Sequence, residues 1–129
     1  MISLDPILAV KDVALSVQWY QTVFGLKPRH GGDTFEIMVS EQDEVVLCLH
    51  KWGEHEHPSL SDVTIPSGNG LLLYFRTHDL EAVFQKAKAQ GHPVLEEISV
   101  SPNSMKKECS FLDPDGYHIT VSEYHEYRG

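Results

Sequence analysis

Histidines are the side chains best suited to acid–base chemistry or metal binding near neutral pH, and the chain has eight of them. His50, His55 and His57 cluster around the end of a predicted strand and the loop that follows it. The spacing of His55 and His57 fits a pair of metal ligands, whereas the acidic neighbours Glu54 and Glu56 fit a solvated loop. We interpret this segment as a solvated loop and keep a metal role as the alternative.

Two further side chains could do chemistry if the fold brings them to a cavity. His118 lies just after a strong turn, and beside Asp5 in a buried position it could act as a general base. A surface or core position for His118 is the other interpretation. Trp52, at the mouth of the longest predicted loop, could stack on a flat or cationic ligand or anchor that loop.

The elements that must position these residues occur in the same order twice. In the first half, Asp12 can cap a helix over residues 13–24, because its carboxylate accepts free amide hydrogens of the first turn. Apolar residues recur at helical spacing along this stretch, and Gly25 can end it. In the second half, Asp79 caps a helix that ends near Gly91. A module that is present only twice suggests a duplication whose halves pack together.

Short apolar runs separated by turn residues predict four strands in each half. The strands are predicted at residues 6–10, 27–30, 34–40 and 45–51, and again at 71–75, 93–98, 106–112 and 117–123. We therefore predict an α+β fold of two βαβββ modules that form one curved, cup-like mixed sheet with helices on its outer face. The chain forms a single domain, with module one at about 1–52, module two at about 70–125 and a linking loop at 53–69.

Composition narrows the classes of partner. The chain has 129 residues and a net charge of −9, which argues against nucleic acid and anionic membranes as partners. Cys48 and Cys109 are far apart without a CxxC motif, so we expect buried thiols in a reducing compartment. Residues 1–6 contain no secretory signal, and no apolar run is long enough to span a bilayer. We expect a cytoplasmic protein.

Five segments of the chain carry a family resemblance: Ala9-Val10-Lys11-Asp12, Trp19-Tyr20, Phe24-Gly25-Leu26, Asp79-Leu80 and Phe111-Leu112-Asp113-Pro114-Asp115-Gly116-Tyr117. Together they resemble the vicinal oxygen chelate superfamily, which includes glyoxalase I, bleomycin-resistance proteins, fosfomycin-resistance enzymes and extradiol dioxygenases. The resemblance covers essentially the whole chain and implies the duplicated βαβββ fold. It is most similar to the small bleomycin-resistance-like members, which implies a homodimer.

The resemblance also implies four strand positions that hold a metal ion in the enzymes of this family. They fall on Asp5, on Cys48 or Leu47, on Leu72 and on Thr120. Leucine cannot bind a metal ion and threonine is a poor ligand, so at most two of the four are suitable. We therefore predict no metal and no other cofactor, with one divalent ion as the alternative.

Residues two apart on a strand share a face, so the implied positions indicate what else points into the cup. The predicted ligand-binding cavity is lined by Asp5, Ile7, Cys48, His50, Trp52, Leu72, Tyr74, His118, Thr120 and Ser122. This mixture of apolar and polar groups suits a small organic ligand, either cationic or aromatic.

We predict a metal-independent small-molecule-binding protein that resembles bleomycin-resistance proteins and sequesters its ligand. The alternative is a divalent-metal-dependent enzyme of the glyoxalase lyase or dioxygenase type, with a ligand set altered to Asp5, His50 and His118.

Overall fold

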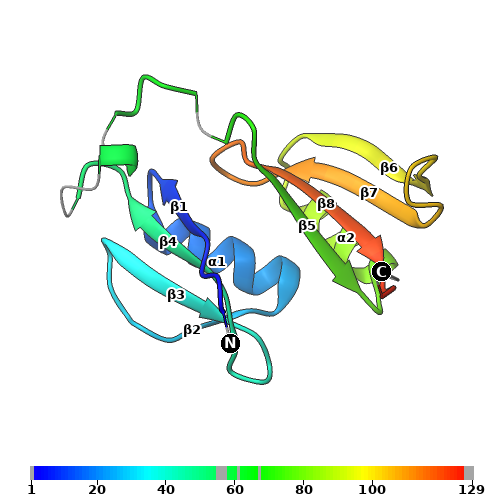
Figure 1. The fold of residues 1–129 in the computed structure, drawn as a ribbon, viewed down its shortest axis with the longest axis horizontal. Helices are drawn as coiled ribbons and strands as arrows, with labels where there is room; N and C mark the ends of the chain where they lie inside the picture. Colours follow the sequence, from blue (N-terminus) through cyan, green and yellow to red (C-terminus); the bar gives the residue numbers. More distant parts are fainter. Residues whose placement is uncertain (1, 55–57, 61, 67, 127–129) are drawn as a thin grey trace. The chain divides into compact units, whose positions relative to one another are not determined.

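The computed structural model describes residues 2–54, 58–60, 62–66 and 68–126, and the chain divides into two compact units, Met1–Ser67 and Gly68–Gly129 (Figure 1). Within the described ranges, each unit contains one α-helix and one four-stranded mixed sheet. This confirms the predicted α+β fold with two βαβββ modules.

The sheet of the first unit has the strand order β1-β4-β3-β2, in which β1 and β4 run parallel and the other neighbours run antiparallel. Its elements are β1 (Ile7–Val10), α1 (Val13–Phe24), β2 (Lys27–Pro28), β3 (Phe35–Val39) and β4 (Val45–Lys51). A short 3-10 helix, η1 (Pro58–Leu60), follows within the linking segment.

Helix α1 begins and ends where the sequence predicted. The Asp12 carboxylate accepts a hydrogen bond from the Leu15 N–H at 3.1 Å, and Gly25 takes the left-handed conformation at φ 70°. Trp19 and Tyr20 are buried, and their rings meet edge to face at 4.9 Å between centroids. Both aromatic side chains therefore pack in the core of the first unit.

The sheet of the second unit repeats the topology as β5-β8-β7-β6, again with a parallel pair, β5 and β8. Its elements are β5 (Leu72–Thr77), α2 (Leu80–Ala89), β6 (Val94–Val100), β7 (Lys107–Leu112) and β8 (His118–Glu123). The Asp79 carboxylate caps α2 by accepting from the Ala82 N–H at 3.2 Å. Leu80, Phe84 and Ala87 form the buried side of α2.

The turn between β7 and β8 is held by its first residue. Asp113 is buried, and one oxygen of its carboxylate accepts the N–H groups of Asp115 and Tyr117, both at 2.9 Å. Gly116 adopts φ 89°, which L-residues with a side chain rarely adopt. The Asp-Pro-Asp-Gly segment is thus structural, as predicted, and it sets where β8 starts.

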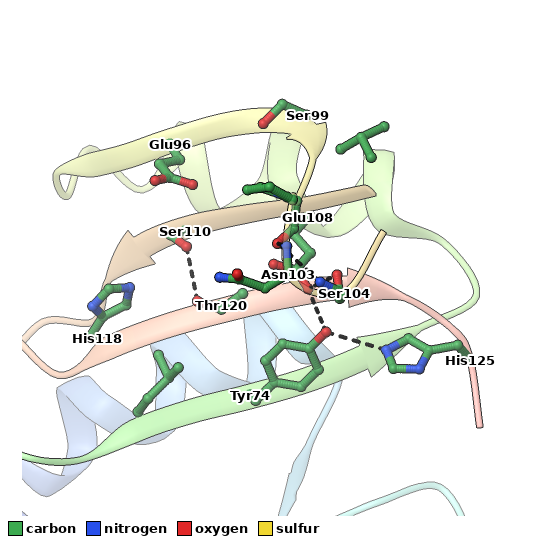
Figure 2. Close-up of a pocket in the computed structure, with 14 residues that line it drawn as sticks. Tyr74, Glu96, Ser99, Asn103, Ser104, Glu108, Ser110, His118, Thr120 and His125 are labelled. Atoms are coloured by element: carbon green, nitrogen blue, oxygen red, sulfur yellow. Dashed lines mark hydrogen bonds between the residues drawn. The ribbon is translucent and has the colours of Figure 1, made fainter. Parts of the chain in front are cut away.

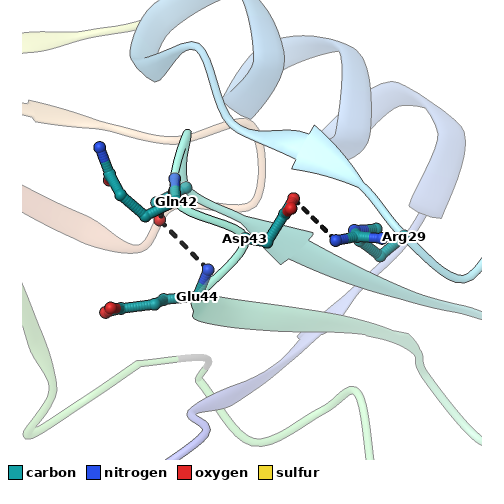
Figure 3. A network of polar contacts seen from close by, with 5 residues as sticks. Arg29, Gln42, Asp43 and Glu44 are labelled. Carbon is teal, nitrogen blue, oxygen red and sulfur yellow. Dashed lines mark hydrogen bonds and ion pairs between the residues drawn. The ribbon is translucent and has the colours of Figure 1, made fainter.

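The turn between β3 and β4 is organised mainly by local hydrogen bonds (Figure 3). The Ser40 hydroxyl accepts the N–H groups of Gln42 and Glu44, both at 3.3 Å, and Asp43 takes a positive φ of 61°. Arg29 and Asp43 form an ion pair at 2.7 Å, and both side chains are more than half exposed. Exposed pairs of this kind contribute at most about 1 kcal/mol, so the turn geometry dominates.

The predicted strand at 27–30 ends at Pro28, and the cause is a buried carboxylate on β3. Glu36 is only 3% exposed, and its carboxylate accepts the N–H groups of Arg29, His30 and Gly31. The Arg29 N–H also donates to the Ile37 carbonyl of β3 at 2.9 Å, whereas the N–H groups of His30 and Gly31 serve the Glu36 side chain, and the chain beyond Arg29 therefore curls around Glu36. Burial alone would raise the pKa of Glu36, but the backbone N–H donors outweigh it and lower the pKa.

We expect Glu36→Gln to lower the free energy of unfolding by about 1–3 kcal/mol at neutral pH, because the amide NH₂ would face backbone donors. The contribution of Glu36 is present above the ordinary carboxyl pKa and is lost as the pH falls through its lowered value. The difference between the wild type and the variant should therefore shrink in acid.

Urea unfolding of the wild type and of Glu36→Gln, from neutral pH down to a pH below the lowered pKa of Glu36, measures the effect. Glu41→Gln, at an exposed position in the β3–β4 turn, removes the same charge and serves as the control. A Glu36→Gln variant as stable as the wild type at neutral pH would show that the carboxylate does not hold the loop.

The two cysteines are free and buried, one in each sheet. Burial raises the pKa of the Cys48 thiol, and the nearby Asp5 charge adds to this; burial also raises the pKa of Cys109 to about 12. Thiolate is the reactive form, so neither thiol should react with a disulfide reagent in mildly alkaline buffer. We expect labelling only after denaturant is added, as followed by absorbance.

Ser3→Cys, at an exposed position, supplies a thiol that should react at once in the same assay. Rapid labelling of Cys48 in the native protein would mean that its face of the sheet is open to solvent.

Candidate ligand-binding site

One face of the second sheet is polar, and the strand register decides which residues lie on it. Leu72 pairs with His118, and Tyr74 pairs with Thr120, across β5 and β8. On the next strand, β7, Ser110 pairs with Thr120. The intervening residues on the opposite face, among them Phe111, Ile119 and Val121, are at most 2% exposed. The sheet therefore separates an apolar core face from a face that offers hydroxyl and imidazole groups.

A cavity of about 660 Å³ lies over this polar face. Four residues predicted from the sequence line it: Leu72, Tyr74, His118 and Thr120. Other lining residues come from β6, from β7, from the connection between these strands and from the segment after β8. Polar members of this group are Glu96, Ser99, Ser101, Asn103, Ser104, Glu108, Ser110 and His125, most of which are labelled in Figure 2.

Glu108 is the centre of a hydrogen-bond network on the wall of the cavity (Figure 2). Its Oε2 atom accepts the hydroxyl of Tyr74 at 2.6 Å and the hydroxyl of Ser104 at 2.7 Å. The Tyr74 oxygen lies 3.3 Å from Nε2 of His125. Because the Tyr74 hydrogen goes to Glu108, this oxygen acts as the acceptor, and His125 carries its hydrogen on Nε2.

Two hydroxyls, those of Ser110 and Thr120, form the floor of the cavity. Their oxygen atoms lie 2.9 Å apart, and the residues are 6% and 7% exposed. They come from neighbouring strands, β7 and β8, and meet because their Cα atoms are paired in register. The cavity thus has a buried polar floor rather than an apolar one.

The charge of the cavity is negative. Glu96 and Glu108 contribute carboxylates, whereas the described residues that line the cavity include no lysine or arginine. Arg76 lies on β5 two residues after Tyr74, but its guanidinium donates to the His125 carbonyl at 2.6 Å and lies 5.5 Å from the Tyr124 ring centre. The arrangement therefore suits a ligand that donates hydrogen bonds or carries positive charge.

Three of the remaining predicted site residues form a second group, on the first unit. Ile7 pairs with Cys48, and Ala9 pairs with His50, so Ile7, Cys48 and His50 share one face of that sheet. Cys48 lies on this face, and Leu47 lies on the opposite one with Leu49. Cys48 and His50 are 4% and 2% exposed, and Nδ1 of His50 lies 2.8 Å from the Lys51 carbonyl oxygen.

Three predicted residues have other surroundings. Asp5 is exposed and lies before β1, where its charge acts on Cys48. Trp52 is half-buried, and its backbone N–H donates to the Val10 carbonyl at 3.2 Å. Ser122 is fully buried and its hydroxyl donates to the Glu123 carbonyl at 2.9 Å, so it is not among the residues lining the cavity. His55 and His57 lie outside the described residues.

The side chains at the implied metal positions do not fit a metal ion. Leu72 offers no donor atom, and the Thr120 hydroxyl is engaged with Ser110. Across the described part of the chain, no three His, Cys, Asp or Glu side chains are grouped so that they could hold a metal ion.

Sequence reasoning missed Glu108, Ser110, Ser104 and His125. Strand alternation relates Glu108 to Ser110 on β7, but no residue of β7 was among the predicted site residues. No pattern in the sequence signals Ser104 or His125, since each reaches the cavity from outside a strand.

Of the helices that the structure describes, none is both long and apolar enough to cross a membrane.

Comparison with known proteins agrees with the fold. The sequence matches the Glyoxalase/Bleomycin resistance protein/Dioxygenase superfamily over residues 3–121. No curated protein matches the chain in sequence.

Solved structures of similar fold include proteins from three bacteria. A protein of unknown function from Agrobacterium tumefaciens str. C58 is 23% identical, with a TM-score of 0.70 over 97% of this chain and 95% of that one. An integron cassette protein of V. cholerae is 25% identical, with a TM-score of 0.70 over 97% and 98% of the two chains. A glyoxalase/bleomycin resistance protein/dioxygenase family enzyme from Burkholderia phytofirmans PsJN is 18% identical, with a TM-score of 0.74 over 91% and 94%. On the match over residues 3–121, the chain belongs to the Glyoxalase/Bleomycin resistance protein/Dioxygenase superfamily.

Proposed function

We propose that this protein binds and sequesters a small polar organic molecule, in the manner of bleomycin-resistance proteins, without using a metal ion. The observation that carries the proposal is the cavity of about 660 Å³ over the second sheet, with its buried hydroxyl floor and its positioned carboxylate. Cavities that hold small ligands commonly measure about 300–1,000 Å³ and place a few polar groups among apolar ones.

Binding would rest on hydrogen bonds and charge. The cavity presents hydrogen-bond donors and acceptors whose positions are set by strand pairing and by their mutual hydrogen bonds. They belong to Tyr74, Ser110, Thr120 and Glu108. Groups held in place before binding lose little conformational freedom on binding, which raises affinity. The net charge of −9 would also steer a cationic ligand toward the protein.

A metal-dependent lyase or dioxygenase is the less favoured function. Such an enzyme uses a metal ion as a Lewis acid, which requires several ligands around one point. The side chains at the family positions include Leu72 and a Thr120 that already bonds to Ser110. The chemistry of these residues therefore supports a binding protein rather than a metalloenzyme.

A thermal-shift screen of small amines, amides and aromatic cations tests this function, and we expect ligands that raise the melting temperature equally with and without a chelator. Leu72→Arg should abolish these shifts, because Leu72 is half-exposed on the cavity wall and the new side chain would add bulk and positive charge there. The matched control is Leu95→Arg, at an exposed position on β6 that is not among the residues lining the cavity.

Elemental mass spectrometry of the protein accompanies the screen, after equilibration with Zn, Ni, Mn and Fe(II) and extensive dialysis. We expect a metal content near zero. A content near one ion per chain, or shifts that vanish with the chelator, would refute the metal-independent function.

We further propose that the protein acts as a homodimer. Strand β1 lies at an edge of its sheet, and the apolar side chains of Ile2, Leu4 and Ile7 in and before it are 97%, 82% and 47% exposed. An exposed apolar edge strand favours pairing with another chain.

The free buried thiols fit a reducing compartment, and we propose that the protein is cytoplasmic, which cell fractionation would test.

Light scattering should give a mass in solution twice the chain mass of 14.6 kDa. Ile7→Lys places a charge on the β1 edge and should yield a folded monomer, whereas Val63→Lys, at an exposed position in the linking segment, should leave the dimer intact. A wild-type mass of one chain would show that the protein is a monomer.

A further inference from the structure

The hydrogen bonds of Glu108 leave one of its two oxygen atoms unused. Both hydroxyl donors, from Tyr74 and Ser104, reach Oε2. Among the described residues, no donor is bonded to Oε1 and no lysine, arginine or histidine forms an ion pair with Glu108. Oε1 of this half-buried carboxylate is therefore open to a positively charged donor of a ligand, and such charge-assisted hydrogen bonds are strong.

The same two hydroxyls fix where Oε1 lies. The Tyr74 hydroxyl comes from β5, and Ser104 comes from the connection between β6 and β7, so Glu108 is held from two sides (Figure 2). The Ser104 oxygen also accepts the Lys106 N–H at 3.2 Å, which holds Ser104 in place within this connection, just before β7 begins. The carboxylate is therefore oriented before any ligand arrives.

The cavity floor has a second unused group, a hydroxyl hydrogen. Ser110 and Thr120 together carry two hydroxyl hydrogens, and the bond between them uses one. Within the described part of the chain, nothing accepts the other hydrogen. The residues are more than nine-tenths buried and line the cavity, so an acceptor atom of a ligand is the partner that this donor lacks.

We propose that the ligand carries a protonated amine, which donates to Oε1 of Glu108, and an oxygen atom, which accepts from the Ser110–Thr120 hydroxyl pair. This inference rests on the proposed function and names the class of ligand as amino alcohols and amino sugars. Glu108 and Ser110 are two residues apart on β7, which places their Cα atoms about 7 Å apart. A small carbon ring that bears both groups would span this distance.

An anionic ligand does not fit the same groups. A carboxylate or phosphate would meet Glu96 and Glu108, and the described lining residues offer no lysine or arginine to compensate. A neutral polyol could satisfy the floor donor but would leave Glu108 without a cation. The combination of both unused groups therefore selects for the amine.

Aminocyclohexanols and the matching cyclohexanediols are suitable probes, because each pair differs only in the amine. We expect NMR titrations to show that the amino compounds bind at least about tenfold more tightly, since hydrogen bonds between charged groups are the strong ones. Shifts of the Ser110 and Thr120 amide signals would place the probes in the cavity. Glu108→Gln keeps the size of the side chain and should reduce this preference to about twofold or less.

Two further variants separate the contributions of the two groups. Glu97→Gln removes an equal charge from an exposed position on β6 and should leave the amine preference unchanged. Thr120→Val should weaken the amino compounds and the diols by similar factors. Melting temperatures of all variants, measured beside the titrations, show whether the variants fold. If Glu108→Gln does not fold, Tyr74→Phe replaces it, because this change removes one of the two hydroxyls that orient the Glu108 carboxylate.

The outcomes distinguish this inference from the function on which it rests. If amino compounds and diols bind in the cavity equally well, or if Glu108→Gln keeps the preference, the assigned ligand class is wrong and the binding function stands. If no probe, and no compound from the thermal-shift screen, moves the cavity signals, both are wrong.

Discussion

The register between β7 and β8 is the constraint on which the candidate site depends. It pairs Ser110 with Thr120 and so places the two hydroxyls within hydrogen-bond distance. A shift of one residue would turn the hydroxyls toward the core and expose Ile119 and Val121, which are now fully buried. The buried Asp113 carboxylate holds the turn between these strands, and it therefore helps to set both the core and the cavity.

The two units share a topology but differ in the chemistry of corresponding sheet faces. In the first unit this face carries Ile7, Cys48 and a deeply buried His50. In the second unit it carries Tyr74, Thr120 and Glu108 around an open cavity. The same fold thus supports two chemically different sheet faces, because the backbone hydrogen bonds of a sheet do not depend on which side chains project from it.

Within this superfamily, the departure at the metal positions has a physical counterpart on the neighbouring strand. Leu72 and Thr120 leave the usual positions without a suitable donor set, while Glu108 on β7 brings a carboxylate into the cavity from elsewhere. Hydroxyl groups from Tyr74 and Ser104 orient this carboxylate. Under the proposed function, this oriented carboxylate is the group that a cationic ligand would contact.

The sequence by itself determined the elements whose signals are local. Asp12 and Asp79 cap the helices, Gly116 completes the last turn, and alternation on β8 puts His118 and Thr120 on one face. It also identified the family, which supplied one position before β1 and others on β4, β5 and β8. Local patterns have these successes because each depends on residues within a few positions of one another.

Only the tertiary structure decided the network around Glu108 and the end of β2. Tyr74 and Glu108 are 34 residues apart, and Tyr74 and His125 are 51 apart, so no short-range pattern records that they meet. Likewise, Glu36 draws in the N–H groups of His30 and Gly31, five or six residues away, and ends a strand that propensity would extend. Such contacts depend on how strands and loops are brought together, which the folded chain alone specifies.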